Sequence, residues 1–517
     1  MSPGVKTSRL PTGLSLQENL ENLNYEEKQM TESVYRPGAS STLSTWSAID
    51  WRATEKLVLR LQMRIAKATR EGRHGKAKAL QWILTHSYSA KLLAIKRVSQ
   101  NKGRKTPGVD GVVWNSDKKK TLAVESLNRR GYQPQPLRRV YIPKKNGKQR
   151  PLGIPCMIDK AQQALHLLSL EPISETIVDK NAYGFRPKRS VADAIEQCFK
   201  ATCRKTSAQW ILEGDIKACF DEIGHQWLTE NIPMDKTMLN KWLTSGYIEK
   251  GLFYHTDAGT PQGGIISPTL MLLTLSGLEK CVKQAAPKKA DKINFISYAD
   301  DFVITGASKE VLESKIKPLV EAFLRERGLS LSQEKTRIAH ISEGFDFLGF
   351  NIRKYNDKLL IKPAKENVLS FVRNIRAIIK KHPTMAAGDL IRILNPKTRG
   401  WANYYRHSVA KQTFGYVDCQ VFKSLYRWAK RRHPNKSTGW IVRKYFRTEL
   451  SSKWKFQGVS AQEHQFLVEM ASVPIKRHLK IRGDANPYDP NYVEYFQRRS
   501  RRKLGRNTWV DTTLTAL

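Results

Sequence analysis

Cysteine is scarce in this chain, which has six cysteines among its 517 residues. So few cysteines in so long a chain exclude a disulfide scaffold. No two of them form a CxxC pair, which disfavours a zinc ribbon or a zinc-bearing nuclease module. The chain also lacks any run of roughly 18 apolar residues, and it has no apolar signal-peptide core near its start. We therefore expect no membrane span and an intracellular location, in a bacterial cytoplasm or in an organelle.

Acidic residues are outnumbered by basic ones, at 47 Asp and Glu against 89 Lys and Arg, which gives a formal net charge of +42. A compact fold holds this charge at a cost in self-repulsion, and the usual reason to keep it is a polyanionic partner. An anionic membrane would require an amphipathic anchor, which the sequence does not contain. We therefore expect a nucleic acid as partner. The length predicts about three to five domains.

The character of the sequence changes several times along the chain. We expect a disordered leader at residues 1–45 and a helical N-terminal extension at 46–136. A mixed α/β region follows at 137–360, then an all-helical region at 361–440 and a basic, loop-rich region at 441–517.

Periodic apolar residues predict several helices. One begins at Trp51, a second spans 75–98, and two later ones fit 389–406 and 416–432. A further helix after Pro363 carries an apolar stripe at Leu369, Val372, Ile375 and Ile379. Strands are expected at four short β-prone runs, namely RRVYIP, WILEGDI, FISYADDFVIT and FDFLGFNI.

Three carboxylates lie at the ends of predicted strands. Asp300 and Asp301 form the turn of ISYADDFVI, and Asp215 follows the short apolar strand WIL. Adjacent acids next to a core are costly unless a cation neutralises them. Three such ligands suit one or two Mg²⁺ ions, and two ions can stabilise the attacking and leaving oxygens of a phosphoryl transfer. The sequence therefore predicts metal-dependent phosphoryl transfer.

Two further motifs fit a nucleotide substrate. The glycines of AGTPQGGIISPTL, at residues 258–270, allow a tight turn whose backbone can approach a ligand closely. The hairpin RRVYIPKKNGKQRPLGIP gathers basic residues that include Lys144 and Arg150. This hairpin is either a solvated turn or a clamp for a triphosphate, for which the planar guanidinium of arginine is well suited.

The order of the motifs resembles that of the reverse transcriptases encoded by group II introns. The basic hairpin is followed by YGFRPKRS, DIKACF, GTPQGGIISP, YADD, LSLSQEKT and FDFLGF, and NPKTRGWANYYRH resembles the maturase, or thumb, domain of that family. The resemblance implies a right-hand polymerase, with α/β fingers and a palm built on an antiparallel sheet. An all-α thumb or maturase domain and a basic DNA-binding segment would follow.

The resemblance also implies roles for individual residues. Asp215, Asp300 and Asp301 would be catalytic and, with Ile216, would hold two Mg²⁺ ions. Phe220 would exclude the 2′-hydroxyl of a ribonucleotide, and Gly349 would belong to the primer grip. The other residues expected to bind the nucleotide are Lys144, Arg150, Gln262 and Lys335.

The expected partners are intron RNA, a DNA target and primer, and deoxynucleotides. RNA contacts are expected from Arg104 and Lys105 in the loop at 101–111 and from exposed cations of the thumb, namely Arg373, Arg376 and Lys380. DNA contacts are expected from the basic tail, at Arg498, Arg499, Arg501 and Arg502. The absence of CxxC motifs predicts no His-Asn-His endonuclease module, and the oligomeric state stays open.

Three functions are compatible with these motifs. The first is a polymerase that binds its intron RNA, assists splicing as a maturase and copies the RNA into DNA at a target site. The second is a reverse transcriptase recruited to CRISPR spacer acquisition or phage defence, which the maturase-like helices disfavour. The third is a splicing-only maturase, which the intact carboxylates disfavour.

Overall fold

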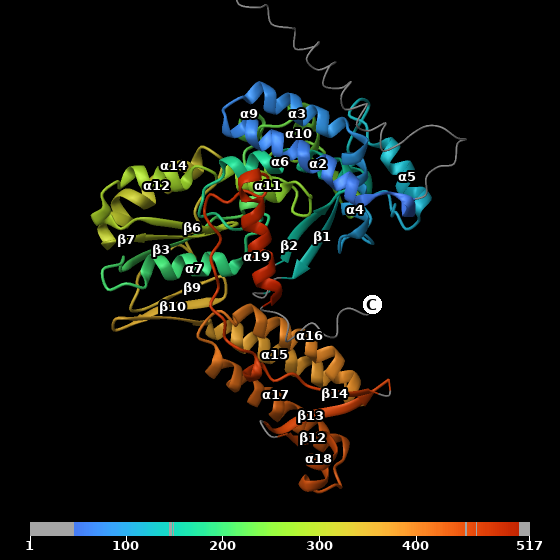
Figure 1. The fold of residues 1–517 in the computed structure, drawn as a ribbon, viewed down its shortest axis with the longest axis vertical. Coiled ribbons are helices and arrows are strands. Elements are labelled where there is room, and N and C mark those ends of the chain that lie inside the picture. The colour runs from blue at the N-terminus through green and yellow to red at the C-terminus, as the bar shows by residue number, and fades with distance from the viewer. Residues whose placement is uncertain (1–45, 144–146, 148, 450–451, 462, 506–517) are drawn as a thin grey trace, which may run out of the picture.

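The computed structural model describes residues 46–143, 147, 149–449, 452–461 and 463–505. The predicted leader at residues 1–45 and Lys144 lie outside these ranges. In the described part of the chain, no helix has both the length and the apolar character needed to cross a membrane. Figure 1 shows a helical N-terminal region above the central strands and a second helical body below them.

The N-terminal region is helical, as predicted. The helix expected from Trp51 is α2, and the Asp50 carboxylate caps it by accepting a 3.0 Å hydrogen bond from the Ala53 amide. The single helix predicted for 75–98 is wrong, because the chain breaks at Ser87, whose hydroxyl caps the next helix through the Ala90 amide. The elements are η1 (Trp46–Ala48), α2 (Trp51–Arg70), α3 (His74–His86), α4 (Tyr88–Gln100) and α5 (Asp117–Ser126).

Two four-stranded sheets form the middle of the molecule. The first sheet has the order β2-β1-β4-β5, and its elements are β1 (Leu137–Pro143), β2 (Gln149–Ile154), β4 (Tyr247–Glu249) and β5 (Leu252–Tyr254). The central sheet is antiparallel with the order β6-β7-β3-β8, and its elements are β3 (Trp210–Asp215), β6 (Asn294–Tyr298), β7 (Asp301–Gly306) and β8 (Arg337–His340). The strands predicted from RRVYIP, WILEGDI and FISYADDFVIT are thereby confirmed.

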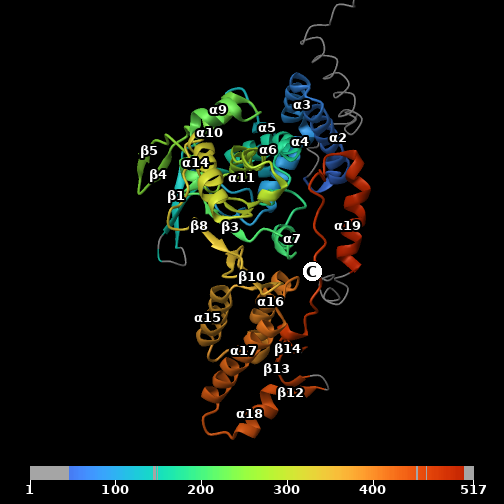
Figure 2. The same cartoon turned by 90° about the vertical axis from the view of Figure 1, so that its left-hand side faces the viewer.

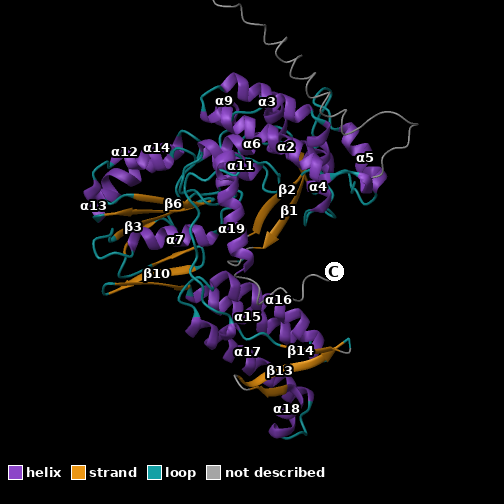
Figure 3. Cartoon of the chain, viewed as in Figure 1, coloured by secondary structure: helices purple, strands orange, loops and turns teal. Residues whose placement is uncertain are grey.

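Helices surround the central sheet, as Figure 3 shows. They are α6 (Met157–Ile177), α7 (Val191–Thr202), α8 (Cys219–Glu222), α9 (His225–Asn231), α10 (Lys236–Leu243), α11 (Ser267–Thr274), α12 (Leu278–Ala285), η2 (Lys289–Asp291), α13 (Lys309–Val311), the π-helical turn η3 (Leu312–Ile316) and α14 (Lys317–Arg325). Helix α6 packs against α2, α3 and α4, so it joins the N-terminal region to the middle of the molecule.

A small sheet connects the middle of the molecule to the lower helical body. Its order is β11-β10-β9, with β9 (Phe345–Phe347), β10 (Phe350–Tyr355) and β11 (Lys358–Pro363), and it confirms the strands predicted from FDFLGFNI. The lower body contains α15 (Lys365–Lys381), α16 (Ala387–Tyr405), α17 (Lys411–Arg432) and α18 (Thr438–Tyr445). One hydrophobic core runs from α7 through this sheet into α15, α16 and α17.

The apolar stripe of α15 differs from the prediction by one position. Val372, Ile375 and Ile379 are buried as expected, but Val368 takes the fourth place and Leu369 is only half-buried. The reason is the helical repeat, because position 368 lies four residues before 372 and shares its face more closely than 369 does.

The region after α18 is more ordered than predicted. Instead of loops alone, it contains a sheet of order β12-β13-β14, with β12 (Phe446–Glu449), β13 (Ser452–Ser460) and β14 (Glu463–Phe466), followed by η4 (Met470–Ser472), η5 (Pro490–Tyr492) and α19 (Val493–Gly505). Between η4 and η5, residues 473–489 form an extended segment, here called the C-terminal strap. Figures 1 and 2 show that it leaves the lower body, crosses the middle of the molecule and reaches α2.

Candidate active site

The three predicted carboxylates meet at one end of the central sheet. Asp215 ends β3 and is paired in register with Asp301, the first residue of β7. Asp300 lies in the turn between β6 and β7, in which Tyr298 pairs with Asp301. Two neighbouring antiparallel strands therefore present all three acids at the same edge, as the sequence predicted.

The turn that carries Asp300 is held by a glycine of the YGFRPKRS motif. Ala299 has a φ of 60°, in the left-handed region that an L-residue rarely adopts, so this turn needs support from its surroundings. The backbone of Tyr183 donates a 2.9 Å hydrogen bond to the Ser297 carbonyl. A Cβ added at Gly184 would come within 2.2 Å of the Ala299 nitrogen. Only glycine allows this close approach.

Burial and mutual repulsion make the carboxylates hard to ionise together. Burial, and then repulsion from Asp300 and Asp215, raise the pKa of Asp301 to about 7. Burial and repulsion from Asp215 also raise the pKa of Asp300, while the positive charges of Arg150 and Lys335 lower it. Because burial and mutual repulsion oppose the ionisation of these carboxylates, the site favours any cation that neutralises their negative charge.

Lys335 supplies one such cation. Its ammonium group donates hydrogen bonds of 3.0 and 2.9 Å to the two oxygens of Asp215, and this contact raises the pKa of the lysine. The Lys335 side chain stays 65% exposed, whereas that of Asp215 is 17% exposed. The lysine thus lies at the exposed edge of the carboxylate cluster, and its role beside a nucleotide stays a prediction.

The carboxylate side chains by themselves do not form a complete set of ligands for a metal ion. Within the described ranges, no three or more His, Cys, Asp or Glu side chains are gathered into a metal-binding group. The donor chemistry nevertheless fits Mg²⁺, because carboxylate oxygens are its preferred protein ligands and Mg²⁺ commonly takes the rest of its ligands from water and substrate phosphates.

Phe220 and the PQGG loop lie next to the carboxylates. The half-buried Phe220 ring meets the exposed Phe185 ring edge-on, with centroids 6.2 Å apart. The Phe220 carbonyl accepts a 2.6 Å hydrogen bond from the Thr260 amide, which attaches the loop to α8. The Gln262 side chain donates a 2.8 Å hydrogen bond to Asp221. The structure therefore brings both predicted residues to the Asp215 end of the sheet.

The two predicted triphosphate contacts have different outcomes. Arg150 is exposed on β2, opposite Ile142, and is close enough to Asp300 to affect its pKa. Lys144 lies outside the described residues, so its predicted role stays a prediction.

Gly349 occupies a turn that only glycine accommodates. Its φ is 79°, and a Cβ there would come within 2.5 Å of the side-chain amide nitrogen of Asn367. The Tyr405 hydroxyl donates a 3.1 Å hydrogen bond to the Gly349 carbonyl, and the Tyr404 hydroxyl donates one of 2.8 Å to the Leu348 carbonyl. The NPKTRGWANYYRH motif therefore fixes the predicted primer grip through its two tyrosines.

The residues predicted to contact RNA are all exposed. Arg104 and Lys105 lie in the loop that precedes α5, and Lys380 lies in the last turn of α15. Arg373 forms an ion pair with Glu366, and Arg376 donates a 2.5 Å hydrogen bond to Gln420. Each of these contacts uses one terminal nitrogen of a guanidinium group that has five N–H donors, so both exposed arginines can still donate to a phosphate.

The predicted DNA contacts of the tail need one correction. Arg498 and Arg501 are exposed on α19, and the Arg502 side chain is not described. Arg499 is only 12% exposed, and it donates hydrogen bonds of 2.6 Å to the Leu479 carbonyl and 2.8 Å to Asp193. We therefore withdraw Arg499 as a DNA contact, because its guanidinium group is already bound inside the protein.

The sequence also contains site residues that the motif analysis did not assign. Gly184 supports the catalytic turn, Asp221 orients Gln262, and the buried Cys219 thiol lies beside the acids, where burial and nearby negative charge raise its pKa. Gly184 lies within YGFRPKRS, and the other two lie within or directly after DIKACF. Their roles follow only from contacts between distant segments.

Three family models match this chain in the expected order. Residues 46–127 match the N-terminal domain of reverse transcriptase. Residues 142–352 match reverse transcriptase (RNA-dependent DNA polymerase), and residues 368–446 match the group II intron, maturase-specific domain.

Two proteins with related sequences and one solved structure are also similar to this chain. Protein YkfC of Escherichia coli is 33% identical over 331 residues, which cover 54% of this chain and 86% of YkfC. Group II intron-encoded protein LtrA of Lactococcus lactis is 29% identical over 411 residues, which cover 60% of this chain and 68% of LtrA. A telomerase structure from Candida albicans aligns with a TM-score of 0.36 and 10% identity, over 60% of this chain and 64% of the telomerase chain.

Proposed function

This chain belongs to the family of group II intron-encoded reverse transcriptases and maturases, and we propose that it copies its own intron RNA into DNA after helping that RNA to splice. It is an RNA-directed DNA polymerase with a maturase domain. The observation that carries the polymerase role is the pairing of Asp215 with Asp301 beside Asp300. The finer roles below are our proposals.

Asp215, Asp300 and Asp301 would hold two Mg²⁺ ions, with the backbone of Ile216 as a further ligand. When bound, the ions would neutralise the carboxylates and stabilise the attacking and leaving oxygens of the phosphoryl transfer. The raised pKa values of Asp300 and Asp301 support this role, because burial and then repulsion between the carboxylates cause them, and a bound divalent cation would offset both effects.

The remaining contacts of the site would position the nucleotide. Arg150 would bind its phosphates, and Lys335 would turn from Asp215 toward the leaving pyrophosphate. Phe220 would occupy the space that a 2′-hydroxyl needs, and Gln262, held by Asp221, would line the pocket from the other side. The primer end would rest on the backbone of the turn at Gly349.

The maturase role would depend on RNA binding rather than on side-chain chemistry, because the intron RNA carries its own catalytic groups. The net charge of +42 supports binding through phosphates and shape. The match at residues 368–446 favours this role over spacer acquisition or phage defence. The DNA target and primer and the deoxynucleotides belong to the same proposal.

The direct test uses the purified protein with two substrates. It should extend a DNA primer on an RNA template when Mg²⁺ is present, and it should accelerate splicing of a precursor RNA that contains its intron. Extension without any effect on splicing would contradict the maturase proposal. Faster splicing without extension would contradict the polymerase proposal and favour the splicing-only alternative.

A further inference from the structure

The C-terminal strap, residues 473–489, links regions of the molecule that are far apart in the sequence. Figures 1 and 2 show it running from the lower body past α7 to α2, after which α19 returns toward the lower body. Ile481 and Ala485 of the strap are each 1% exposed and belong to the core that also contains α7, β10 and α16. The strap is therefore built into the protein and does not lie loosely on its surface.

The strap and α19 share one buried anchor, Asp193 of α7. One oxygen of this fully buried carboxylate accepts three hydrogen bonds, from the His478 ring (2.8 Å), the Ile481 amide (2.7 Å) and Arg499 (2.8 Å). The other oxygen accepts a 2.7 Å bond from Ser190. Burial opposes ionisation, but the hydrogen bonds and the nearby charge of His478 lower the pKa of Asp193 to about 2. This carboxylate is thus charged at neutral pH and stabilised by the strap and α19.

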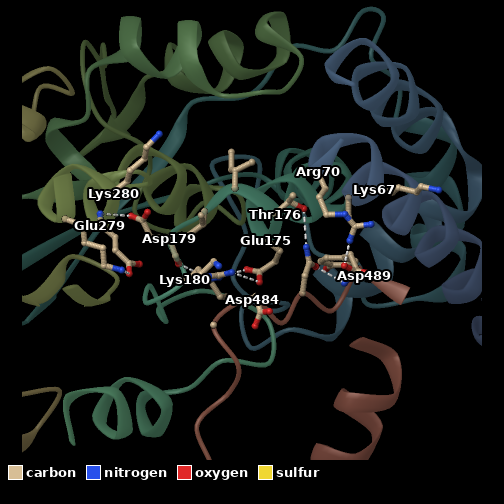
Figure 4. A pocket seen from close by; sticks show the side chains of 18 of the residues that line it. Lys67, Arg70, Glu175, Thr176, Asp179, Lys180, Glu279, Lys280, Asp484 and Asp489 are labelled. Atoms are coloured by element: carbon tan, nitrogen blue, oxygen red, sulfur yellow. Dashed lines mark hydrogen bonds and ion pairs between the residues drawn. The ribbon is translucent and has the colours of Figure 1, made fainter. Parts of the chain in front are cut away.

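On its upper side the strap is attached to α6 and α2. Asn486 donates a 3.1 Å hydrogen bond to Thr176, the Tyr488 hydroxyl donates one to Glu171, and Asp489 forms an ion pair with Arg70. Figure 4 shows Arg70, Thr176 and Asp489 at a cavity of about 660 Å³, which Asn486 and Tyr488 also line. The strap thereby joins the N-terminal region to the middle of the molecule.

On its lower side the strap is attached to the end of α16, beside the primer grip. The Lys476 amide donates a 2.9 Å hydrogen bond to the Arg406 carbonyl. The His478 and His407 rings lie 6.1 Å apart, and the His407 ring lies 5.2 Å from that of Phe350, the residue directly after Gly349. A continuous set of contacts therefore runs from Asp193 to the predicted primer grip.

The same strap also contacts the motif that supports the catalytic turn. Lys480 donates a 3.4 Å hydrogen bond to the Tyr183 hydroxyl, and Arg189 donates one of 2.8 Å to the Gly483 carbonyl. Tyr183 directly precedes Gly184, whose backbone touches Ala299. The strap thus contacts both the support of the Asp300 turn and the support of the Gly349 turn.

We propose that Asp193 and Arg499 are positioning residues for DNA synthesis, which hold the primer grip in register with the catalytic turn by clamping the C-terminal strap onto α7. The proposal rests on the polymerase function given above. It assigns Arg499 to the polymerase, although the sequence of the basic tail predicted a DNA contact. Two discrete contact regions joined by packed side chains are the kind of network through which such coupling is carried.

The first test compares two charge-removing substitutions. Arg499→Gln removes the buried clamp. Arg477→Gln removes a strap arginine that also reaches α7, but only through an exposed ion pair: its side chain is 72% exposed and lies 3.4 Å from Glu196. We expect Arg499→Gln to raise the KM for primer–template and to shorten the product made per binding event, each by about three- to tenfold. Its kcat for single-nucleotide addition should stay within about twofold. Arg477→Gln should change all three values by less than about twofold, because an exposed ion pair contributes little to holding the strap on α7.

The second test restores the clamp without the arginine. A Cβ at Gly483 would lie 3.3 Å from the Lys180 Cβ, slightly below the disulfide range of about 3.5–4.5 Å, so after a small backbone shift Lys180→Cys with Gly483→Cys can tether the strap to the loop that follows α6. The exposed Cys419 is changed to Ser in all proteins to avoid unwanted pairing. In the Arg499→Gln background, the oxidised tether should return the product length to that of the wild type, and reduction should remove the rescue.

These outcomes separate positioning from the alternatives. A tether cannot replace a phosphate contact, so a short product length that persists although the disulfide has formed would overturn the proposal and favour DNA or RNA binding by Arg499. A wild-type product length in the Arg499→Gln variant would overturn it as well. Failure of the wild-type protein to extend any primer would instead contradict the polymerase function itself. Thermal unfolding of each variant identifies a loss caused by misfolding, and Arg499→Lys, which keeps the charge, should recover part of the effect.

Discussion

Asp215 and Asp301 face each other across the pairing of β3 and β7, and Lys335 holds Asp215 by both carboxylate oxygens. The Lys335 ammonium group is thus a positive charge at the edge of the negatively charged carboxylate cluster. This contact offsets part of the repulsion among the three neighbouring carboxylates. The negative charge of this carboxylate cluster is what substitutions of Asp300 and Asp301 reduce.

Asp300→Asn should abolish DNA synthesis. The amide has almost the same shape as the carboxylate but supplies no charge to hold a metal ion, and a loss of at least ~10³-fold in rate is expected if electrostatic stabilisation is the main catalytic effect. The measurement is primer extension on an RNA template. Extension near the wild-type rate would remove Asp300 from the site.

The stability of the metal-free protein should depend on the charge of Asp301. Its pKa is raised from 3.8 to about 7, so between these values the folded protein holds a proton that the unfolded chain has released. The free energy of unfolding therefore falls as the pH rises through this range. Asp301→Asn removes the effect and should be more stable than the wild type by roughly 1–3 kcal/mol at pH 8.

Urea unfolding in the presence of a chelator tests this difference. The gap between Asp301→Asn and the wild type should be large at pH 8 and close to zero at about pH 3, because the wild-type carboxyl is then mostly neutral in both the folded and the unfolded state. A gap of the same size at both pH values would show that the asparagine changes packing rather than charge.

The sequence was sufficient to locate the three clustered carboxylates and most of the strands that hold them. Asp215, Asp300 and Asp301 follow directly from short motifs at strand ends, because alternating apolar residues and turn residues are local signals. The role of Gly184 could not be predicted in this way. Gly184 is required because its backbone lies against that of Ala299, which is 115 residues further along the chain. No local sequence pattern predicts such a contact.

The basic tail illustrates the same limit. Arg498 and Arg499 are adjacent and look equivalent in the sequence, yet one is exposed and the other is bound to the buried Asp193. The predicted helix at 75–98 failed for a different reason, since Ser87 both interrupts one helix and caps the next. Both predictions failed because the role of each residue depends on the groups that it contacts in the folded protein.

Phe220→Ala should weaken the discrimination between sugars. The ring is proposed to fill the space required by a 2′-hydroxyl, and one such contact can supply a few kcal/mol of selectivity. The measurement is the ratio of kcat/KM for single additions of a deoxynucleotide and the matching ribonucleotide. Phe185→Ala is the control, because it removes the ring that meets Phe220 edge-on and leaves the proposed gate in place. An unchanged ratio in Phe220→Ala would assign the gate to another residue.

Gly349→Ala should weaken primer binding. The added methyl group would lie 2.5 Å from the side-chain amide nitrogen of Asn367, and alanine would have to adopt a φ of 79°. The turn or the Asn367 side chain must therefore move. We expect the KM for primer–template to rise by about three- to tenfold while the KM for the nucleotide changes little. Gly415→Ala is the matched control, because this exposed position in α17 has no atom within 4 Å of the new methyl group. Equal behaviour of the two variants would contradict a role for Gly349 in holding the primer.

Splicing and copying should be separable by mutation. Asp215→Ala with Asp300→Ala removes the proposed metal ligands, so copying should be lost, whereas splicing should stay largely intact because the intron RNA supplies its own chemistry. The converse variant changes Arg373, Arg376 and Lys380 to Gln, which removes up to three phosphate contacts. The slope of log affinity against log salt concentration should then fall by up to about 2–3.

The packing of α15 should survive this converse variant, because its buried positions Val368, Val372, Ile375 and Ile379 are untouched. Extension of a short primed template at low salt should therefore decrease less than splicing does. Splicing rate, primer extension and RNA affinity against salt are measured on the same preparations. If the aspartate variant loses splicing as completely as it loses copying while its fold stays intact, the two functions share one site. The maturase role would then not rest on RNA binding alone, since binding by the basic surface does not require the carboxylates.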